Sequence, residues 1–302
     1  MKHRILFVVI TAMLGWFSGV ALSAQTRELD FSNLAEFNGI DVSDSFEVTV
    51  NPSNFYGAKV VVDDVLSGFV MVYVKQKTLY INLDERKIPA QVKKLFKGRN
   101  ASKAVLRAVV QVPSLEALTI QDNATVSTNA EFKSNTFALK MTDSGILKGI
   151  NVKAPTITLD LEKKSSASVT VTTCDALTVT TAGTSLLKLT QTSKDLQLNS
   201  KGSSEIESAG DCITLGVTAS NASKVNGTGT AKTLNIEAAA SSEVNLSGVE
   251  AEEAKVVINN GAKVDQSASL KLSIEMNGGS LKMAGNPVIE LVGIKNGTVE
   301  RK

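Results

Sequence analysis

The sequence predicts an all-β fold: a right-handed parallel β-helix, or solenoid, with an N-terminal β-rich cap region. Three observations support this prediction. A small residue, a variable residue and an aliphatic residue recur in that order ten times after residue 115. Short runs that alternate aliphatic and polar residues precede these copies. The chain is 43% hydrophobic but only 5% aromatic, so aliphatic side chains must form its core. Regular recurrence of short strands is typical of solenoids, whose coils bury their inner faces against each other.

Residues 1–24 have the features of a secretory signal peptide. A basic start is followed by an apolar run from Ile5 to Val20 and by the small residues that end at Ala24. A transmembrane anchor is the alternative, but the run is shorter than the ~20 apolar residues of a spanning helix and contains two glycines. We therefore expect an exported protein.

The only histidine, His3, lies within this signal peptide. The exported chain then contains no histidine. Catalytic Ser-His-Asp triads, Cys-His dyads and zinc sites with histidine ligands are excluded by composition alone.

Residues 25–112 predict an N-terminal β-rich region. Alternating runs indicate strands, and turn-forming residues such as Asn51-Pro52 separate them. These runs lie at 46–50, 59–62, 70–74 and 79–83. A basic stretch at 85–107 interrupts the pattern, which resumes at 108–112. We interpret the basic stretch as an insertion.

Residues 113–302 contain the repeats. Their aliphatic positions are 17 to 22 residues apart, which predicts coils of ~19 residues. These positions are Val126, Leu147, Val169, Leu187, Ile206, Val225, Val244, Val264, Leu281 and Val299. The preceding strands are expected at 118–120, 139–141, 159–161, 177–179, 196–198, 213–215, 234–236, 256–258 and 272–274. An antiparallel meander is the alternative, but the turn sequences of tight hairpins are sparse. A parallel crossover is right-handed as a general rule.

The small residue of each copy is always Ala, Gly or Ser. We expect it at a corner where the backbone of one coil lies directly over the next, ~4.8 Å away. A larger side chain there would clash with its own equivalents.

The charge is distributed unevenly. Without the signal peptide, basic and acidic residues are equal in number, but the segment from Arg86 to Arg107 carries eight positive charges and no negative one. These residues are Arg86, Lys87, Lys93, Lys94, Lys97, Arg99, Lys103 and Arg107. Such a cluster attracts anionic glycans, lipopolysaccharide or anionic membranes, and we expect no nucleic acid partner. A solvated loop without a ligand is the alternative.

Part of the same segment predicts a short helix around residues 92–96. Its apolar face would consist of Ile88, Val92, Leu95 and Phe96. Cationic and apolar side chains together suit contact with a membrane surface.

Several motifs resemble the family described as putative auto-transporter adhesin, head GIN domain. The resemblance rests on Phe37-Asn38-Gly39-Ile40-Asp41-Val42, on the strands at 46–50 and 79–83, on Val112-Pro113-Ser114-Leu115 and on the small corner residues beyond. It covers roughly residues 30 to 300. It implies a right-handed β-helix exported by Bacteroides-like bacteria to the periplasm, the outer-membrane surface or the medium. It implies no catalytic, cofactor or metal-binding residues. We expect export by the signal peptide rather than by a translocating segment of the protein's own.

Two functional classes remain open. The first is a non-enzymatic adhesion or interaction scaffold, which we favour. The second is a β-helical enzyme acting on polysaccharide, for which Asp122 and Asp143 at equivalent corners are the best candidates for a catalytic or metal-binding pair. Ser165 is the expected equivalent in the next coil, and ordinary turn residues are the alternative interpretation of the pair. Tyr56, Tyr73 and Tyr80 could provide a sugar-stacking surface or fill the core near the cap.

Two further expectations follow from the register. Cys174 and Cys212 are two coils apart, too far for a disulfide, and should be free thiols. Glu205, Lys224, Glu243 and Lys263 should be vertical neighbours that form a ladder of opposite charges.

Overall fold

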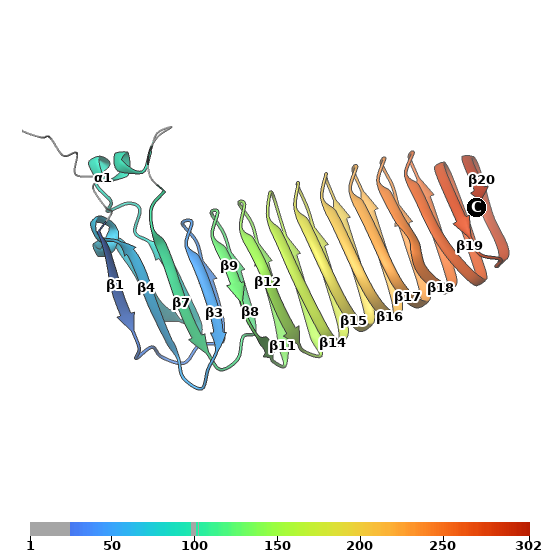
Figure 1. The fold of residues 1–302 in the computed structure, drawn as a ribbon. Coiled ribbons are helices and arrows are strands. Elements are labelled where there is room, and N and C mark those ends of the chain that lie inside the picture. Colours follow the sequence, from blue (N-terminus) through green and yellow to red (C-terminus); the bar gives the residue numbers. More distant parts are fainter. Residues whose placement is uncertain (1–24, 98–100, 102) are drawn as a thin grey trace, which may run out of the picture.

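The computed structural model describes residues 25–97, 101 and 103–302, so the signal peptide expected at residues 1–24 lies outside it. The chain is 69% strand and 4% helix and forms a β-solenoid of about nine turns, which confirms the predicted fold class. The coils are flattened and stack side by side along one axis (Figure 1). Each coil has two faces. We call the strand segment before the corner the first face and the segment after it the second face.

Antiparallel strands and two short helices cover the N-terminal end. β1 pairs antiparallel with β4, β4 with β7, and β5 with β6. These elements are β1 (Thr26–Phe31), β4 (Gly57–Asp63), η1 (Asp64–Phe69), β5 (Val70–Lys75), β6 (Thr78–Leu83), α1 (Ala90–Leu95) and β7 (Leu106–Val112). Leu66 of η1 and Ile88 before α1 are buried there, so this end of the core is closed.

The chain order differs from the order of the coils in space. β2 (Gly39–Val42) lies between β6 and β8, and it is parallel to both. β3 (Glu47–Pro52) likewise lies between β7 and β9. β2 and β3 therefore form a complete coil inside the stack. The chain leaves that coil to build the cap and then returns past it, so the N-terminal β-rich region contributes one coil as well as the cap.

The remaining strands continue the stack in sequence order. Each pairs in parallel with its equivalents in the neighbouring coils. They are β8 (Ala117–Ile120), β9 (Thr125–Thr128), β10 (Glu131–Lys133), β11 (Thr136–Met141), β12 (Ile146–Lys153), β13 (Thr156–Leu161), β14 (Ser166–Thr181), β15 (Leu186–Lys201), β16 (Glu205–Ser220), β17 (Lys224–Ala238), β18 (Glu243–Asn259), β19 (Lys263–Ala284) and β20 (Val288–Arg301). Inward residues alternate with outward ones along both faces, and the inward aliphatic columns form one continuous core.

The corner between the faces explains why a small residue recurs. In most coils two residues with positive φ make the turn, as Asp122 and Asn123 do at 48° and 64°. The small residue follows them and is buried. At Ser185, Ser223 and Ser242 the hydroxyl of this residue donates to a carbonyl of the preceding coil, as Ser223 Oγ does to Ser200 O at 3.0 Å. At Ser165 and Ser204 it donates to a carbonyl of its own turn. Serine at this corner therefore finds a hydrogen-bond acceptor while remaining small enough to stack.

The structure corrects the predicted register at four places. Leu147 pairs with Ala167, and Ala167 pairs with Leu187, so the third copy is Ser165-Ser166-Ala167 rather than the triplet that ends at Val169. On the first face, Leu159 pairs with Val179 rather than with Leu177. The strands expected at 213–215 and 256–258 are displaced to 215–217 and 254–256. Each error is a shift of two residues. Such a shift leaves every side chain on the same side of the sheet, so the alternation pattern cannot detect it.

Candidate anionic-surface contact

The basic segment extends from the cap, at the opposite end of the stack from β20 (Figure 1). The chain leaves β6, forms α1 and returns as β7. Arg86, Lys94 and Lys97 are exposed, and Lys93 is half-buried. Arg99 lies outside the described residues. The predicted short helix is present at Ala90–Leu95, and it places Lys93 and Lys94 in its last turn, where positive charge is favourable to the helix dipole.

Most of the predicted apolar face of this segment is used to dock it. Ile88 is buried, and Val92 and Phe96 are partly buried against the core. Leu95 is 57% exposed. The expectation that all four side chains are available for contact is therefore wrong for three of them, because burying apolar surface against the cap is favourable. The helix presents lysines and one leucine outward.

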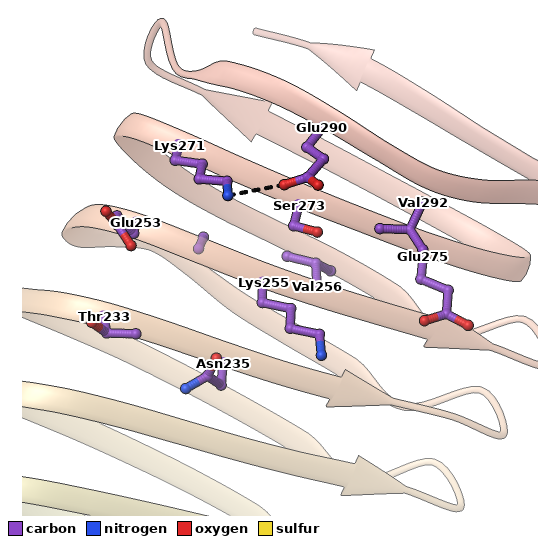
Figure 2. A pocket seen from close by; sticks show the side chains of 11 residues that line it. Thr233, Asn235, Glu253, Lys255, Val256, Lys271, Ser273, Glu275, Glu290 and Val292 are labelled. Atoms are coloured by element: carbon purple, nitrogen blue, oxygen red, sulfur yellow. Dashed lines mark ion pairs between the residues drawn. The ribbon is translucent and has the colours of Figure 1, made fainter.

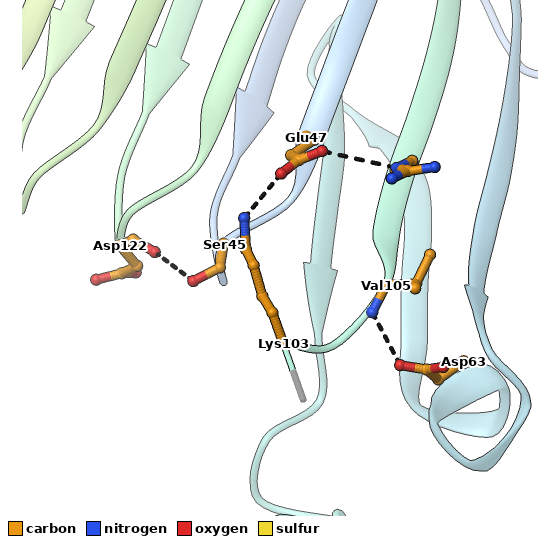
Figure 3. Close-up of polar contacts among 7 residues, drawn as sticks. Ser45, Glu47, Asp63, Lys103, Val105 and Asp122 are labelled. Atoms are coloured by element: carbon orange, nitrogen blue, oxygen red, sulfur yellow. Dashed lines mark hydrogen bonds and ion pairs between the residues drawn. The ribbon is translucent and has the colours of Figure 1, made fainter. Parts of the chain in front are cut away.

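Three of the seven described basic residues form ion pairs with the protein itself. Lys103 Nζ lies 2.7 Å from Glu47 Oε1, and Arg107 Nε lies 3.6 Å from Glu47 Oε2. Lys87 Nζ lies 2.8 Å from Asp84 Oδ2. The hydrogen bond from Lys103 and the nearby positive charges lower the pKa of Glu47. Figure 3 shows the side chain of Lys103 reaching Glu47 of β3. These pairs anchor the segment at both of its ends.

A second contact fixes the point where the segment rejoins the sheet. Asp63 is buried, and its Oδ2 accepts a hydrogen bond from Val105 N at 2.8 Å (Figure 3). Its own backbone N donates to Val105 O at 3.1 Å. The roles of Asp63 and Glu47 could not be predicted from the sequence, because their partners are about 40 to 60 residues away in the chain.

The seven basic residues that the structure describes are therefore divided between two roles. Lys87, Lys103 and Arg107 hold the segment in place. Arg86, Lys93, Lys94 and Lys97 form no ion pair within the part of the chain that the structure describes. The latter group, which we call the α1 basic cluster, is the candidate site.

The acidic corner expected from Asp122 and Asp143 has three members rather than two. Asp44, Asp122 and Asp143 occupy equivalent corners of successive coils, and Ser45 N of the first corner donates to Asp122 O at 3.0 Å. The next equivalent is Lys163, not Ser165, and its ammonium group forms an ion pair with Asp143. Burial, followed by the charges of Asp44 and Asp143, raises the pKa of Asp122. The hydrogen bond from Lys163 lowers the pKa of Asp143.

This corner is a turn whose residues also carry charge. All three aspartates have positive φ, a conformation that Asp and Asn tolerate better than most residues. Among the described residues, no group of three or more His, Cys, Asp or Glu side chains is arranged to hold a metal ion.

Two shallow grooves lie on the faces of the solenoid. One, of about 360 Å³, crosses the first face over β17 to β20 and contains the ion pair Lys271–Glu290 at 2.9 Å (Figure 2). The other, of about 620 Å³, lies on the second face over β15 to β18 and is lined by small and polar side chains, including Asn226 and Asn245. Neither groove has an aromatic lining residue.

The aromatic residues named above lie near the cap. Tyr73 and Tyr80 stack on each other with ring centroids 5.1 Å apart, and Tyr73 is exposed. Tyr56 packs against Phe37 at the edge of the core, with ring centroids 5.4 Å apart. Tyr56 therefore contributes to the core near the cap, whereas Tyr73 is open to solvent.

No helix in the described part of the chain has the length and apolar character needed to cross a membrane.

Comparisons with known proteins give one family and several solved structures. The family described as "Putative auto-transporter adhesin, head GIN domain" matches residues 36–185 and again residues 158–287. A crystal structure of a putative adhesin from Parabacteroides distasonis is 19% identical, covers 93% of this chain and 98% of its own, and has a TM-score of 0.49. A putative adhesin from Parabacteroides merdae is 16% identical, with coverages of 92% and 95% and a TM-score of 0.46. A putative lipid binding protein from Parabacteroides distasonis is 19% identical, with coverages of 92% and 96% and a TM-score of 0.45. The comparison with curated proteins gives no match.

Proposed function

Because the chain belongs to the family described as putative auto-transporter adhesin, head GIN domain, we propose that it is an exported, non-enzymatic interaction scaffold of the bacterial cell envelope. In this proposal the α1 basic cluster, Arg86, Lys93, Lys94 and Lys97, contacts an anionic envelope surface, and the solenoid extends away from it. The anionic groups would be the phosphates and carboxylates of lipopolysaccharide, an acidic glycan or a membrane.

The separation of charge along the molecule is the observation that carries the proposal. The segment from Arg86 to Arg107 has eight positive charges, and the rest of the exported chain has a net charge of −8. An anionic surface would attract the cap end and repel the remainder, which favours one orientation. The outward position of Lys94, Leu95 and Lys97 supports direct contact.

The expected strength of binding to an anionic membrane follows from the number of lysines in the α1 basic cluster. A lysine or arginine close to an anionic membrane contributes about 1 kcal/mol. Three lysines would contribute about 3 kcal/mol, which corresponds to roughly a hundredfold in affinity. Salt weakens this attraction, because the Debye length falls to about 8 Å at physiological ionic strength.

The test compares two triple variants in sedimentation with anionic vesicles and with lipopolysaccharide at low ionic strength. Lys93→Ser, Lys94→Ser and Lys97→Ser together should reduce binding about a hundredfold and leave the β-sheet circular dichroism unchanged. The matched control, Lys201→Ser, Lys232→Ser and Lys255→Ser, removes the same charge from exposed positions on the solenoid and should retain most binding.

Equal losses in the two variants would mean that only net charge matters and would contradict a localised contact. If the unmodified protein binds neither surface, the basic segment is a solubilising loop and the proposed contact is wrong. Fractionation of the native cells tests export separately: recovery of the chain with the cytoplasm would contradict the envelope assignment.

A further inference from the structure

We propose that the groove on the second face over β15 to β18 binds an extended, uncharged polysaccharide chain. This site is separate from the α1 basic cluster and does not depend on attraction between charges. Its volume of about 620 Å³ lies within the range of about 300 to 1,000 Å³ that is usual for ligand sites. The groove lies within the stack, where β14 and β19 pair with the strands on either side of it (Figure 1).

The groove lies over two coils whose inward column lacks aliphatic side chains. Leu189 of β15 and Leu246 of β18 belong to the core and are 2% and 0% exposed. Between them, the inward positions of β16 and β17 are occupied by Ser208 and Gly227, which pair with each other and are both half-buried. Aliphatic residues at these two positions would bury more apolar surface and would favour folding. The groove therefore coincides with a departure of the chain from its own core pattern.

The next inward positions of the same two strands are also unusual. Gly210 and Gly229 have φ +137° and +127°, values that other residues rarely adopt. A Cβ on Gly229 would lie 2.0 Å from Gly210 O, so the two backbones approach each other closely. Departures from the local rules of a fold, concentrated in one place, are expected where a protein has a functional site.

A β-bulge in β18 places an additional residue beside the groove. Asn226 pairs with Asn245, but the next pair is Thr228 with Gly248, so β18 has one residue more than β17 between these pairs. Ser247 of the bulge lines the groove, and its Oγ donates to Asn245 Oδ1 at 2.9 Å. Bulges change the direction of side chains and are frequent next to active sites. This bulge fixes the orientation of the Asn245 amide.

The two asparagines offer complementary hydrogen-bonding groups. Asn245 Oδ1 accepts from Ser247 N and Oγ, which leaves its Nδ2 to donate to a ligand. Asn226 Nδ2 donates to Glu205 Oε1 at 3.5 Å, which leaves its Oδ1 to accept. A hydroxyl group can both donate and accept, so neighbouring sugar hydroxyls match this pair of amides. The hydroxyl of Thr190, which also lines the groove, adds a further partner.

The groove is unsuited to anions and to extended peptides. Its two charged lining residues, Lys188 and Glu207, form an ion pair with each other at 3.4 Å, so the groove has no net charge. The strands beneath it pair in parallel with both neighbours, so their backbone groups are not free to bind a peptide as an added strand. A ligand rich in neutral hydroxyl groups has the chemistry that remains.

The repeat of the solenoid favours an extended chain over a single sugar. Lys188, Glu207, Asn226 and Asn245 form one outward column along the stack. Neighbouring strands are about 4.8 Å apart, so the four strands span about 14 Å. A β-1,4-linked chain of pyranose sugars is a flat ribbon whose repeat per sugar is close to this strand spacing. Such a chain, lying parallel to the axis, would place successive sugars over successive coils.

Nuclear magnetic resonance titration of the exported chain with neutral hexasaccharides tests the site. The probes are cellohexaose and mannohexaose, which are β-1,4-linked, and maltohexaose, whose α-1,4-linked chain is helical. At least one β-1,4-linked probe should bind more tightly than maltohexaose and should shift the amide signals of residues 188–190, 207–209, 226–228 and 245–248. Binding should not change with salt, and the triple lysine variant of the α1 basic cluster should bind equally well, so this test is independent of the contact with an anionic surface.

Two pairs of variants locate the binding. Ala209→Leu fills the groove from its exposed side and should abolish binding, whereas Ala138→Leu, at an exposed position of the first face, should not change it. Asn226→Ala with Asn245→Ala should weaken binding about tenfold or more, because several hydrogen bonds are lost. The control Asn235→Ala removes an amide from the groove on the first face and should have no effect.

The titration of the unmodified protein decides the matter even if a variant fails to fold. The proposal is overturned if neither β-1,4-linked probe shifts any signal, if maltohexaose binds as tightly as they do, or if the shifted signals belong to the first face. Equal losses in Ala209→Leu and Ala138→Leu would also overturn it, because they would show that the ligand does not occupy this groove.

Discussion

Cys174 and Cys212 lie in one column of the solenoid, with Ser193 of the intervening coil between them. Cys174 pairs with Ser193, and the adjacent pair Thr192–Asp211 places Cys212 in the coil beyond. Two strand spacings separate the cysteines by about 9.6 Å, whereas a disulfide requires Cα atoms within about 7 Å. Both thiols are free in the structure.

We predict two unmodified, slowly reacting thiols. Burial raises the pKa of each from 9.0 to about 11, so little thiolate exists at pH 8. Mass spectrometry after alkylation should find both thiols free, with modification much faster in denaturant than in buffer. A bridge between them would show that the register is wrong.

The same pKa values predict how stability depends on alkaline pH. The unfolded chain loses its thiol protons from pH 9 upward, whereas the folded chain keeps them until about pH 11. Stability should therefore fall as the pH rises from 9 to 11. Replacing Cys174 and Cys212 with Ala should reduce this fall, as measured by urea unfolding at each pH.

The four residues of the charge ladder are vertical neighbours, as expected. In the strand register Glu205 lies beside Lys224, Lys224 beside Glu243, and Glu243 beside Lys263. Among the described residues, the ion pair within this ladder joins Glu243 and Lys263. Lys263 Nζ lies 3.0 Å from Glu243 Oε1, and this hydrogen bond lowers the pKa of Glu243. Lys263→Glu should lower the melting temperature at low salt and much less at high salt, with an effect of about 0.2 to 1 kcal/mol because the pair is exposed.

The charge-swapped double variant, Glu243→Lys with Lys263→Glu, is the control for the ladder. It restores that pair but places Lys224 beside a positive charge, so it should recover only part of the loss. If the single and double variants have identical effects at all salt concentrations, the charge ladder does not contribute to stability.

The acidic corner predicts opposite effects for two neighbouring aspartates. The pKa of Asp122 is raised, so its charge opposes folding at neutral pH, and Asp122→Asn should stabilise the protein at pH 7. The pKa of Asp143 is lowered by Lys163, so Asp143→Asn should destabilise it at pH 7. Asparagine suits the positive φ of both positions.

The pH dependence of these two variants distinguishes charge from packing. The stabilisation from Asp143 is present above its unfolded pKa of 3.8 and is lost as the pH falls below it. The penalty from Asp122 disappears as its carboxyl group is protonated at acidic pH. Both differences from the unmodified protein should therefore shrink in melting curves at acidic pH. Differences that persist unchanged there would point to packing instead.

Close stacking of neighbouring coils makes the position of Gly210 intolerant of side chains. Gly210 has φ +137°, and a Cβ at this position would overlap the carbonyl oxygen of Gln191 in the preceding coil. Gly210→Ala should cost about 3 kcal/mol or more, because strain and overlap add. Gly261, with φ +80° and no atom near its Cβ position, isolates the strain: Gly261→Ala should cost only about 1 kcal/mol. Equal losses in chemical denaturation would contradict the close approach of the coils.

The basic segment shows what a local sequence pattern can predict and what it cannot. Its charge and its short helix are local properties, and both could be predicted from the sequence. The pairing of Lys103 and Arg107 with Glu47 could not, because Glu47 belongs to an earlier coil that only the stacked structure brings alongside β7. The docking of Val92 and Phe96 depends in the same way on the cap beneath them.

The sequence by itself determined the repeat, the aliphatic columns, the small corner residues and the neighbours in the charge ladder, because each depends on alternation and spacing within consecutive coils. The tertiary structure alone decided the register of coils that differ by two residues, such as the one containing Ala167, and the placement of β2 and β3 between later strands. A shift of two residues preserves every inward and outward position, and the return of the chain past its first coil is chosen by the burial of surfaces from distant segments. Neither choice leaves a local periodic signal, so each is decided only when the coils pack together.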